Sequence, residues 1–175
     1  NDLKRMLAYS SIAHGGYLSM AFVAHSPLGL QSMLFYLAAY LLMTVGVFGV
    51  AIAVRRNGRE CLSISDFAGL ARQHPVMAGI MSLFLFSLAG MPCTAGFVGK
   101  LWLFGAAIQG EYYALAVVGI LTTLLSFYYY LRVIVFMYMH EPEEGISFNP
   151  IPITGRIATG IAAFGVLLLG VYPNI

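Results

Sequence analysis

One lysine of this chain lies inside an apolar segment, where a charge is costly and therefore informative. Lys100 stands about eight residues before the end of the apolar segment 76–108, or about 12 Å inward at helical rise. Within a membrane, an ammonium group at that depth costs roughly 3 kcal/mol unless it is paired, hydrated or neutralised. If the backbone beside it is unwound, such a lysine can bind and release protons near neutral pH, as a proton relay requires. The alternative is a lysine whose long side chain reaches the membrane surface.

The same segment contains residues that interrupt a helix. As a continuous helix it would be about 50 Å long, well beyond a hydrocarbon core of about 30 Å. Pro92 lacks a backbone donor, and Gly90, Gly96 and Gly99 weaken the helix further. We therefore predict a helix break in mid-membrane, with two half-helices joined by an extended stretch. Backbone freed there must face protein or a water-lined cavity, and such breaks mark ion pathways in transporters.

A second candidate group lies in the first apolar segment. Ser10, His14 and Tyr17 follow i, i+4, i+7 spacing, which places them on one face of a helix. His14 can pass a proton along a water chain, because a histidine titrates close to neutral pH. The alternative is a histidine that only forms a hydrogen bond to a neighbouring helix. Lys4 and Arg5 precede this segment and are interpreted as residues that fix the orientation of the chain in the membrane.

The amino-acid composition indicates the class of protein that contains these residues. Of the 175 residues, 60% are apolar and 9% are charged, and the mean hydropathy is +0.85. A soluble globule needs a larger polar surface, and a net charge of +2 is too small for a nucleic-acid module. The two cysteines, Cys61 and Cys93, form no metal-spaced set and are interpreted as packing residues. The chain is therefore a membrane protein or a piece of one.

Five segments are long and apolar enough to be expected to cross a bilayer. They are residues 6–24, 30–54, 76–108, 112–139 and 157–172, with the third one broken. We predict an all-α polytopic transmembrane helix bundle that forms a single transmembrane domain over residues 1–175. The first residue is not Met and lies in a polar connection, so we also expect a fragment of a longer polytopic chain.

The cations predict the orientation of these spans. Threading five spans places eight of the nine cations on one side, with Lys100 as the exception. The positive-inside rule makes that side cytoplasmic, so the chain is expected to start inside and end outside. Tyr128, Tyr129 and Tyr130 fit an aromatic belt at the inner interface better than a cofactor site. The sequence shows no Ser/His/Asp set, paired buried carboxylates or dinucleotide fingerprint, so redox or hydrolytic catalysis in this chain has no candidate residues.

Three strings carry a resemblance to a known family. They are LKRMLAYSSIAHGGY at residues 3–17, SLAGMPCTAGFVGK at 87–100 and YYYLRV at 128–133. The chain resembles the antiporter-like membrane subunits of the proton-pumping NADH:quinone oxidoreductase, respiratory complex I. Multisubunit sodium/proton antiporters share the first two strings in looser form, whereas the third favours the subunit N branch, of which this chain would be the C-terminal part.

The resemblance implies a proton-translocating subunit coupled to quinone reduction elsewhere in its complex. Lys100 matches the family's protonatable lysine at the end of a half-channel toward the outer side, and Lys4 and His14 match a lysine and a histidine of less certain role in the relay. The resemblance implies no cofactor in this chain, with flavin, iron-sulfur clusters and quinone held elsewhere. The implied partners are other membrane subunits and the lipid bilayer, with no nucleic acid, and the implied location is a bacterial inner (plasma) membrane. Cys93 stands where relatives often have a second proline, which makes the break less rigid.

Two other functions stay open at this point. The first is a subunit of a multisubunit sodium/proton antiporter, which would use the same lysine without a redox arm. The second is a structural membrane module, in which the polar residues only hold helices together. Substitution of Lys100 separates the structural module from the two transport functions.

Overall fold

The protein is a bundle of α-helices in a computed structural model that describes residues 2–24, 26–56, 58–141 and 148–173. The described α-helices are α1 (Leu3–Val23), α2 (Pro27–Ala53), α3 (Leu70–Gln73), α4 (Pro75–Ala89), α5 (Ala95–Gln109), α6 (Tyr113–Met139) and α7 (Ile153–Val171). A 3₁₀ helix, η1, covers Ile64–Phe67, and two-residue strands β1 (Arg55–Arg56) and β2 (Arg59–Glu60) form an antiparallel pair. The small β ladder, which the sequence did not predict, lies in the connection after α2.

Three of the described helices, α2, α6 and α7, are long and apolar enough to cross a membrane, and α4 is a shorter apolar helix. Helix α1 has 21 residues but carries two cations in its first turn and a polar stripe. The expected third span is divided between α4 and α5, each of 15 residues. By length and composition, therefore, three of the five expected spans qualify individually, and the break predicted in the third is present.

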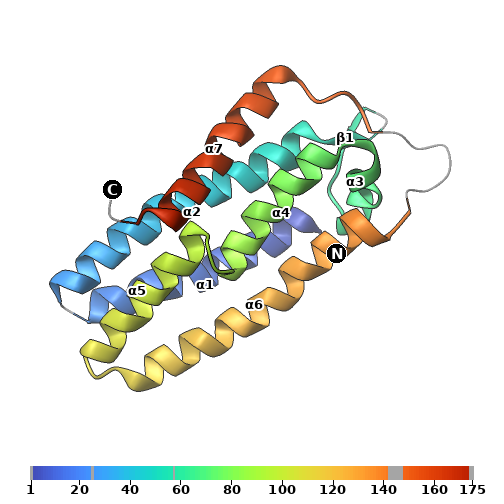
Figure 1. The fold of residues 1–175 in the computed structure, drawn as a ribbon. Helices are drawn as coiled ribbons and strands as arrows, with labels where there is room; N and C mark the ends of the chain where they lie inside the picture. Colours follow the sequence, from blue (N-terminus) through green and yellow to red (C-terminus); the bar gives the residue numbers. More distant parts are fainter. Residues whose placement is uncertain (1, 25, 57, 142–147, 174–175) are drawn as a thin grey trace.

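The helices lie along one common direction, as Figure 1 shows, with α4 and α5 following one another through the bundle. Helix α2 contacts α1, α4, α5 and α7, so it runs along both halves of the divided span. Its buried side includes Ala39, Met43, Val47 and Val50, which have no exposed surface and repeat at helical spacing. This stripe of α2 is the centre of the apolar core.

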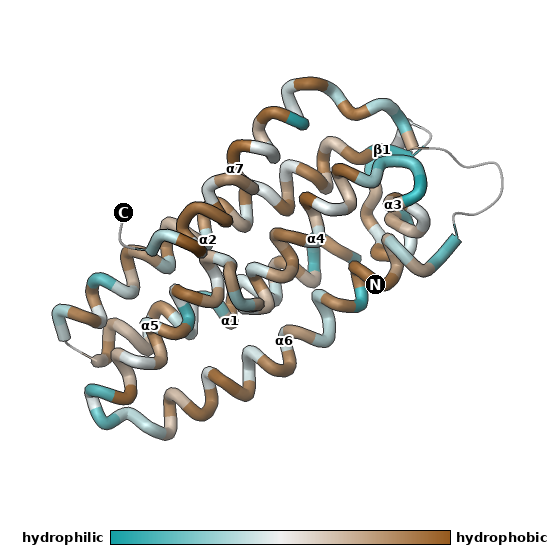
Figure 2. The backbone as a smooth tube through the Cα atoms, viewed as in Figure 1, coloured by the Kyte–Doolittle hydropathy of each residue, from teal (hydrophilic) through white to brown (hydrophobic). Residues whose placement is uncertain are grey.

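The outer faces of the bundle are apolar as well. Large hydrophobic residues of α2 and α6 are exposed at helical spacing, among them Leu30, Leu34, Leu37, Leu41, Leu121, Leu124 and Leu125. Figure 2 shows hydrophobic residues along the helices and hydrophilic ones gathered around α3 and β1, at one end of the bundle. An exposed apolar surface of this extent suits contact with lipid or with further membrane helices.

At the hydrophilic end, which we call the charged end, three ion pairs join residues that the structure describes. They join Lys4 to Glu60 at 2.9 Å, Arg72 to Glu141 at 2.9 Å, and Arg56 to Asp66 at 3.8 Å. The hydrogen bond from Lys4, followed by its charge, lowers the pKa of the Glu60 carboxyl. Lys4 and Arg72 are therefore partnered by carboxylates and remain in contact with water.

The two cysteines differ in their surroundings. Cys61 is buried beside η1, and burial, with a smaller contribution from the charge of Asp66, raises the pKa of its thiol to about 11. This agrees with the prediction of a packing residue. Cys93 is exposed in the break between α4 and α5, so the same prediction was wrong there. Its backbone has φ of 66°, which the tight turn requires and which the sequence pattern did not reveal.

Candidate functional site

Helix α4 ends at the break in a turn that satisfies half of its terminal carbonyls. Gly90 has φ of 89°, a left-handed conformation that suits glycine. Its N–H donates to the carbonyls of Phe86 and Ser87, each at 3.0 Å, and the N–H of Met91 donates to Phe86 at 2.9 Å. This is the Schellman arrangement of a helix C-terminus. It leaves the last two carbonyls of α4 in need of donors from elsewhere.

Lys100 supplies those donors from α5. Its Nζ donates to the carbonyl of Leu88 at 2.8 Å and to that of Ala89 at 3.3 Å. The ammonium group therefore lies at the negative end of the α4 dipole, a favourable position for a cation. Nζ also lies 5.1 Å from the centre of the Tyr17 ring, on the face that attracts cations.

Lys100 is 3% exposed in this chain, so its side chain points into the bundle and does not reach the surface. No ion pair of the described residues includes Lys100. Carbonyl dipoles and an aromatic face replace the carboxylate that a buried cation would ordinarily require. Of the two sequence interpretations, this geometry agrees with the buried lysine rather than with the one that reaches the membrane surface.

The break is shorter than the sequence predicted. It covers residues 90–94 and includes Gly90 and Pro92, whereas Gly96 and Gly99 lie inside α5. A Cβ at position 96 would lie 1.8 Å from the carbonyl oxygen of Ser87, and one at position 99 would lie 2.5 Å from Cδ2 of Tyr36. These two glycines are needed for close packing of α5 against α4 and α2, and they do not interrupt the helix.

The two half-helices are joined across the break by further contacts. The N–H of Gly96 donates to Oγ of Ser87 at 3.1 Å. Thr94 closes the loop, since its hydroxyl donates to the carbonyl of Met91 at 2.6 Å and its own carbonyl accepts from the N–H groups of residues 97 and 98. Helix α7 packs on the same loop, because a Cβ at Gly170 would lie 2.7 Å from the carbonyl oxygen of Cys93.

His14 is the centre of a second buried polar group. Its Nδ1 lies 2.6 Å from the hydroxyl of Tyr36, and its Nε2 lies 3.2 Å from the hydroxyl of Tyr130. The ring stacks on Tyr40 at 4.6 Å and meets Tyr17 edge-on at 5.7 Å. Because Lys100 lies over the same Tyr17 ring, His14 and Lys100 share one tyrosine as a neighbour.

The tyrosines that contact His14 include one that the sequence analysis placed wrongly. Tyr128 is 74% exposed and fits a belt position, but Tyr130 is 1% exposed and hydrogen-bonded to both His14 and Ser10. The spacing of buried residues on α6 carried the missed signal, since Ser126, Tyr130, Val133 and Met137 repeat at intervals of three and four. Tyr36 was also missed, although Tyr36 and Tyr40 lie four residues apart in their apolar span and so share one helix face.

Lys4 lies apart from this cluster. It is in the first turn of α1, ten residues or about 15 Å of helix from His14. Its side chain is 40% exposed and pairs with Glu60 at the charged end. The structure therefore brings together His14 and Lys100, through Tyr17, but not Lys4.

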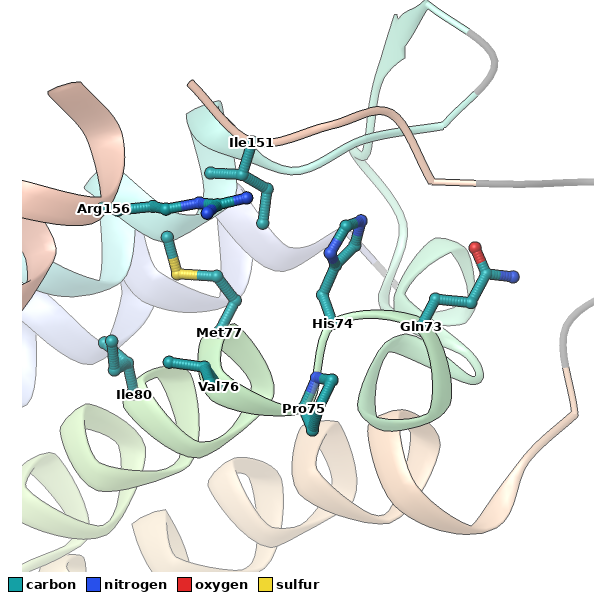
Figure 3. Close-up of a pocket in the computed structure, with 8 residues that line it drawn as sticks. All are labelled: Gln73, His74, Pro75, Val76, Met77, Ile80, Ile151 and Arg156. Atoms are coloured by element: carbon teal, nitrogen blue, oxygen red, sulfur yellow. The ribbon is translucent and has the colours of Figure 1, made fainter. Parts of the chain in front are cut away.

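A hollow of about 260 Å³ lies elsewhere, at the start of α4. Figure 3 shows Arg156 extending above Met77 toward Ile151, with His74 and Pro75 at the other side. The walls are largely apolar and include none of the residues around His14 and Lys100. Among the described residues, no group of three or more His, Cys, Asp or Glu side chains could hold a metal ion. The candidate site is therefore the group of Lys100, Tyr17, His14, Tyr36 and Tyr130, which we call the buried cluster.

Comparison with known proteins gives consistent matches along the chain. It is 42% identical to NADH-quinone oxidoreductase subunit N of Trichlorobacter lovleyi over 99% of its length, and 47% identical to subunit N 1 of Sorangium cellulosum over 99%. The chain spans only 36% and 35% of the length of these two relatives.

Solved structures show the same fold. A chain of respiratory complex I from Thermus thermophilus matches with a TM-score of 0.87 and 31% identity, covering 100% of this chain and 39% of that one. A chain of the Mrp complex from Dietzia sp. matches with a TM-score of 0.81 and 22% identity, covering 94% of this chain and 39% of that one. Residues 1–126 match the family described as NADH:quinone oxidoreductase/Mrp antiporter, transmembrane, and the chain belongs to that family.

Proposed function

We propose that this chain forms part of subunit N of a proton-pumping NADH:quinone oxidoreductase, with Lys100 as a protonation station. The observation that carries the proposal is the placement of a buried lysine amine on the free carbonyls of a helix break. The matches to subunit N along almost the whole chain support the choice of assembly. Quinone reduction elsewhere in the complex would supply the energy.

The geometry explains how a lysine can hold and lose a proton without leaving its place. A protonated amine has three donors, and the neutral amine retains two, so both forms can satisfy the carbonyls of Leu88 and Ala89. What changes between the two forms is the charge, which the α4 dipole and the Tyr17 ring stabilise. His14 also contacts the Tyr17 ring, at 5.7 Å between ring centres, and is the next group that can carry a proton.

The placement in the membrane follows from the same interpretation. Helices α1, α2, α6 and α7 each cross the bilayer, and α4 and α5 cross it together with the break in mid-membrane. The charged end lies on the cytoplasmic side of a bacterial plasma membrane, where Lys4 and Arg5 fix the orientation and Lys4 is a candidate for the start of the relay. Flavin, iron-sulfur clusters and quinone belong to other parts of the complex, and the partners of this chain are neighbouring membrane subunits and lipid.

The test uses the full-length subunit in its assembled complex, with NADH-driven proton pumping measured in membrane vesicles. Lys100→Met removes the amine, whereas Lys100→Arg keeps a cation and donors for the carbonyls but cannot release its proton near neutral pH. We expect both variants to lose proton pumping per NADH oxidised while a native gel shows normal assembly. Leu101→Met, at an exposed neighbouring position, is the matched control. Normal pumping by the assembled Lys100→Met complex would exclude Lys100 as a station and favour a structural module.

A second candidate function is a subunit of a sodium/proton antiporter. It is favoured by the description of the matching family and by the fold shared with the Mrp complex. Sodium-driven proton movement in vesicles without NADH, abolished by Lys100→Met, would support this second function and contradict the first.

A further inference from the structure

We propose that the hydroxyl groups of Ser10, Tyr130 and Tyr36 extend the relay at His14 into one proton-conducting chain that starts from the charged end. This inference rests on the proposed function, because it concerns the route by which protons reach Lys100. It adds proton-transferring side chains from α2 and α6 to the lysine and histidine already considered.

The chain of hydrogen bonds is continuous from Ser10 to Tyr36. Oγ of Ser10 is hydrogen-bonded to the hydroxyl of Tyr130, and that hydroxyl lies 3.2 Å from Nε2 of His14. On the other side of the imidazole, Nδ1 lies 2.6 Å from the hydroxyl of Tyr36. All four side chains are buried. Three helices, α1, α2 and α6, contribute to the chain.

The order of donors along this chain can be reversed. With the proton of neutral His14 on Nδ1, His14 donates to Tyr36, Tyr130 donates to Nε2, and Ser10 donates to Tyr130. With the proton on Nε2, every one of these bonds runs in the opposite direction. The same atoms therefore support two complete hydrogen-bond patterns, which is the property that allows a proton to pass along the chain.

Passage of one proton converts the first pattern into the second. A proton arriving at Oγ of Ser10 releases the hydroxyl proton of Ser10 to Tyr130, and Tyr130 passes its own proton to Nε2 of His14. The imidazolium then gives its Nδ1 proton to Tyr36, whose original proton leaves the chain at the Tyr36 hydroxyl. One proton enters and one leaves, and no group retains an extra charge. The first pattern returns when the hydroxyl groups rotate and the imidazole ring reorients so that its N–H again faces Tyr36.

The first residue of the chain is accessible from the charged end. A cavity of about 470 Å³ between α1 and α6 is lined by Asp2 and Arg5 at one end and by Ser10 and Ser126 further along. Ser10 also borders a second cavity, between α1 and α2, together with Tyr40 and Thr44. Ser10 is thus the point where the buried chain meets space that can hold water, and the charged end supplies the protons.

The experiment uses the full-length subunit in its complex and measures protons pumped per NADH oxidised. Tyr130→Phe, Tyr36→Phe and Ser10→Ala each remove one hydroxyl group and little volume. Tyr128→Phe, on the exposed side of the same helix, and Ser11→Ala, beside Ser10 on the exposed side of α1, are the matched controls. Ser10→Thr restores a hydroxyl, and the adjoining cavities have room for its methyl group.

We expect Tyr130→Phe and Ser10→Ala to lower the pumping ratio about tenfold or more, since a positioned proton donor ordinarily contributes about 10²-fold or more. Tyr36→Phe should have the same effect, both controls should pump normally, and Ser10→Thr should recover most of the loss. The residual pumping of the Tyr130→Phe and Ser10→Ala variants should slow further in deuterated water, because proton transfer then limits the rate. A merely structural hydroxyl would not produce that isotope effect.

The outcomes separate this inference from the function on which it rests. If Lys100→Met abolishes pumping while the assembled Tyr130→Phe and Ser10→Ala complexes pump normally, the hydroxyl chain is wrong and the proposed function stands. If Lys100→Met itself pumps normally, the proposed function fails first. If the Tyr130→Phe complex does not assemble, Ser10→Ala and its rescue by Ser10→Thr decide the test instead. Ser10 borders open space, so its substitution disturbs the packing less.

Discussion

Charged groups at the charged end and in the buried cluster have different partners and a different exposure to water. At the charged end, Lys4 and Arg72 pair with carboxylates and remain largely in water. In the buried cluster, Lys100 has backbone carbonyls and an aromatic ring as its partners. A buried carboxylate would hold the lysine permanently protonated, whereas neutral dipoles leave room for the proton to be lost. Under the proposed function, the charged end fixes the orientation of the chain and the buried cluster exchanges protons.

The same contrast predicts where substitutions are costly. Exposed ion pairs contribute about 0–1 kcal/mol or less. In the buried cluster each polar atom has a specific partner, and an orphaned donor or acceptor costs about 1–3 kcal/mol. Close backbone contacts around the break add steric constraints. The following predictions test this ranking, from the largest expected effect to the smallest.

Gly96→Ala should have the largest effect. Its Cβ would lie 1.8 Å from a backbone oxygen of α4, which cannot move without separating the two half-helices. Overpacking of this kind costs about 1–3 kcal/mol or more, so we expect a marked fall in the thermal stability and the amount of assembled subunit. Gly105→Ala on the same helix has nothing within 4 Å and is the control. Equal stability of the two variants would contradict the close contact.

Gly99→Ala should have a smaller effect that is concentrated on pumping. The new Cβ would lie 2.5 Å from the Tyr36 ring, so the ring must shift. That shift would disturb the hydrogen bond between Tyr36 and His14. We expect partial loss of protons pumped per NADH, with assembly on a native gel closer to that of Gly105→Ala than to that of Gly96→Ala. Unchanged pumping would show that the position of Tyr36 is unimportant.

The two thiols should react very differently. Burial and a raised pKa of about 11 keep Cys61 protonated and inaccessible, whereas Cys93 is exposed in the break. In the detergent-solubilised complex, between about pH 7 and pH 10, a small membrane-permeant maleimide should modify Cys93 long before Cys61, as measured by mass spectrometry of peptides. Cys93→Ser should abolish the early labelling, and unfolding should make Cys61 reactive. Early labelling of Cys61 would contradict its burial beside η1.

Glu60→Gln should have the smallest effect. The carboxyl is exposed, and Lys4 lowers its pKa by a hydrogen bond and by its charge. Because its pKa is lowered in the folded state, the pair stabilises the protein above the ordinary carboxyl pKa, and this stabilisation is lost as the pH falls through the lowered value. We expect a slight decrease in melting temperature at neutral pH that disappears in acid and at high salt, with normal pumping. A large loss of stability would invalidate the contrast between the two regions.

The elements could be predicted from the sequence where apolar or polar residues repeat at regular spacing, or where glycine and proline mark the end of a helix. The apolar segments, the polar stripe of Ser10, His14 and Tyr17, and the break at Gly90 and Pro92 are all present. The partners of His14 could not be predicted, since a tyrosine in an apolar helix is equally suited to lipid and to a buried hydrogen bond. Gly96 and Gly99 were misinterpreted for a related reason: a glycine that breaks a helix and one that admits a neighbour are the same residue in sequence.

The link between Lys100 and α4 has a mechanical consequence. Lys100 belongs to α5 and donates to the last two carbonyls of α4. Its side chain therefore bridges the break, which is the hinge between the two half-helices. Any change in the angle at this hinge must alter the distances from Nζ to those carbonyls and with them the affinity for a proton. By reciprocity, gain or loss of the proton exerts a torque on the hinge. Under the proposed function, bending at residues 90–94 and proton occupancy of Lys100 are therefore coupled, and α7 would be affected through its contact at Gly170.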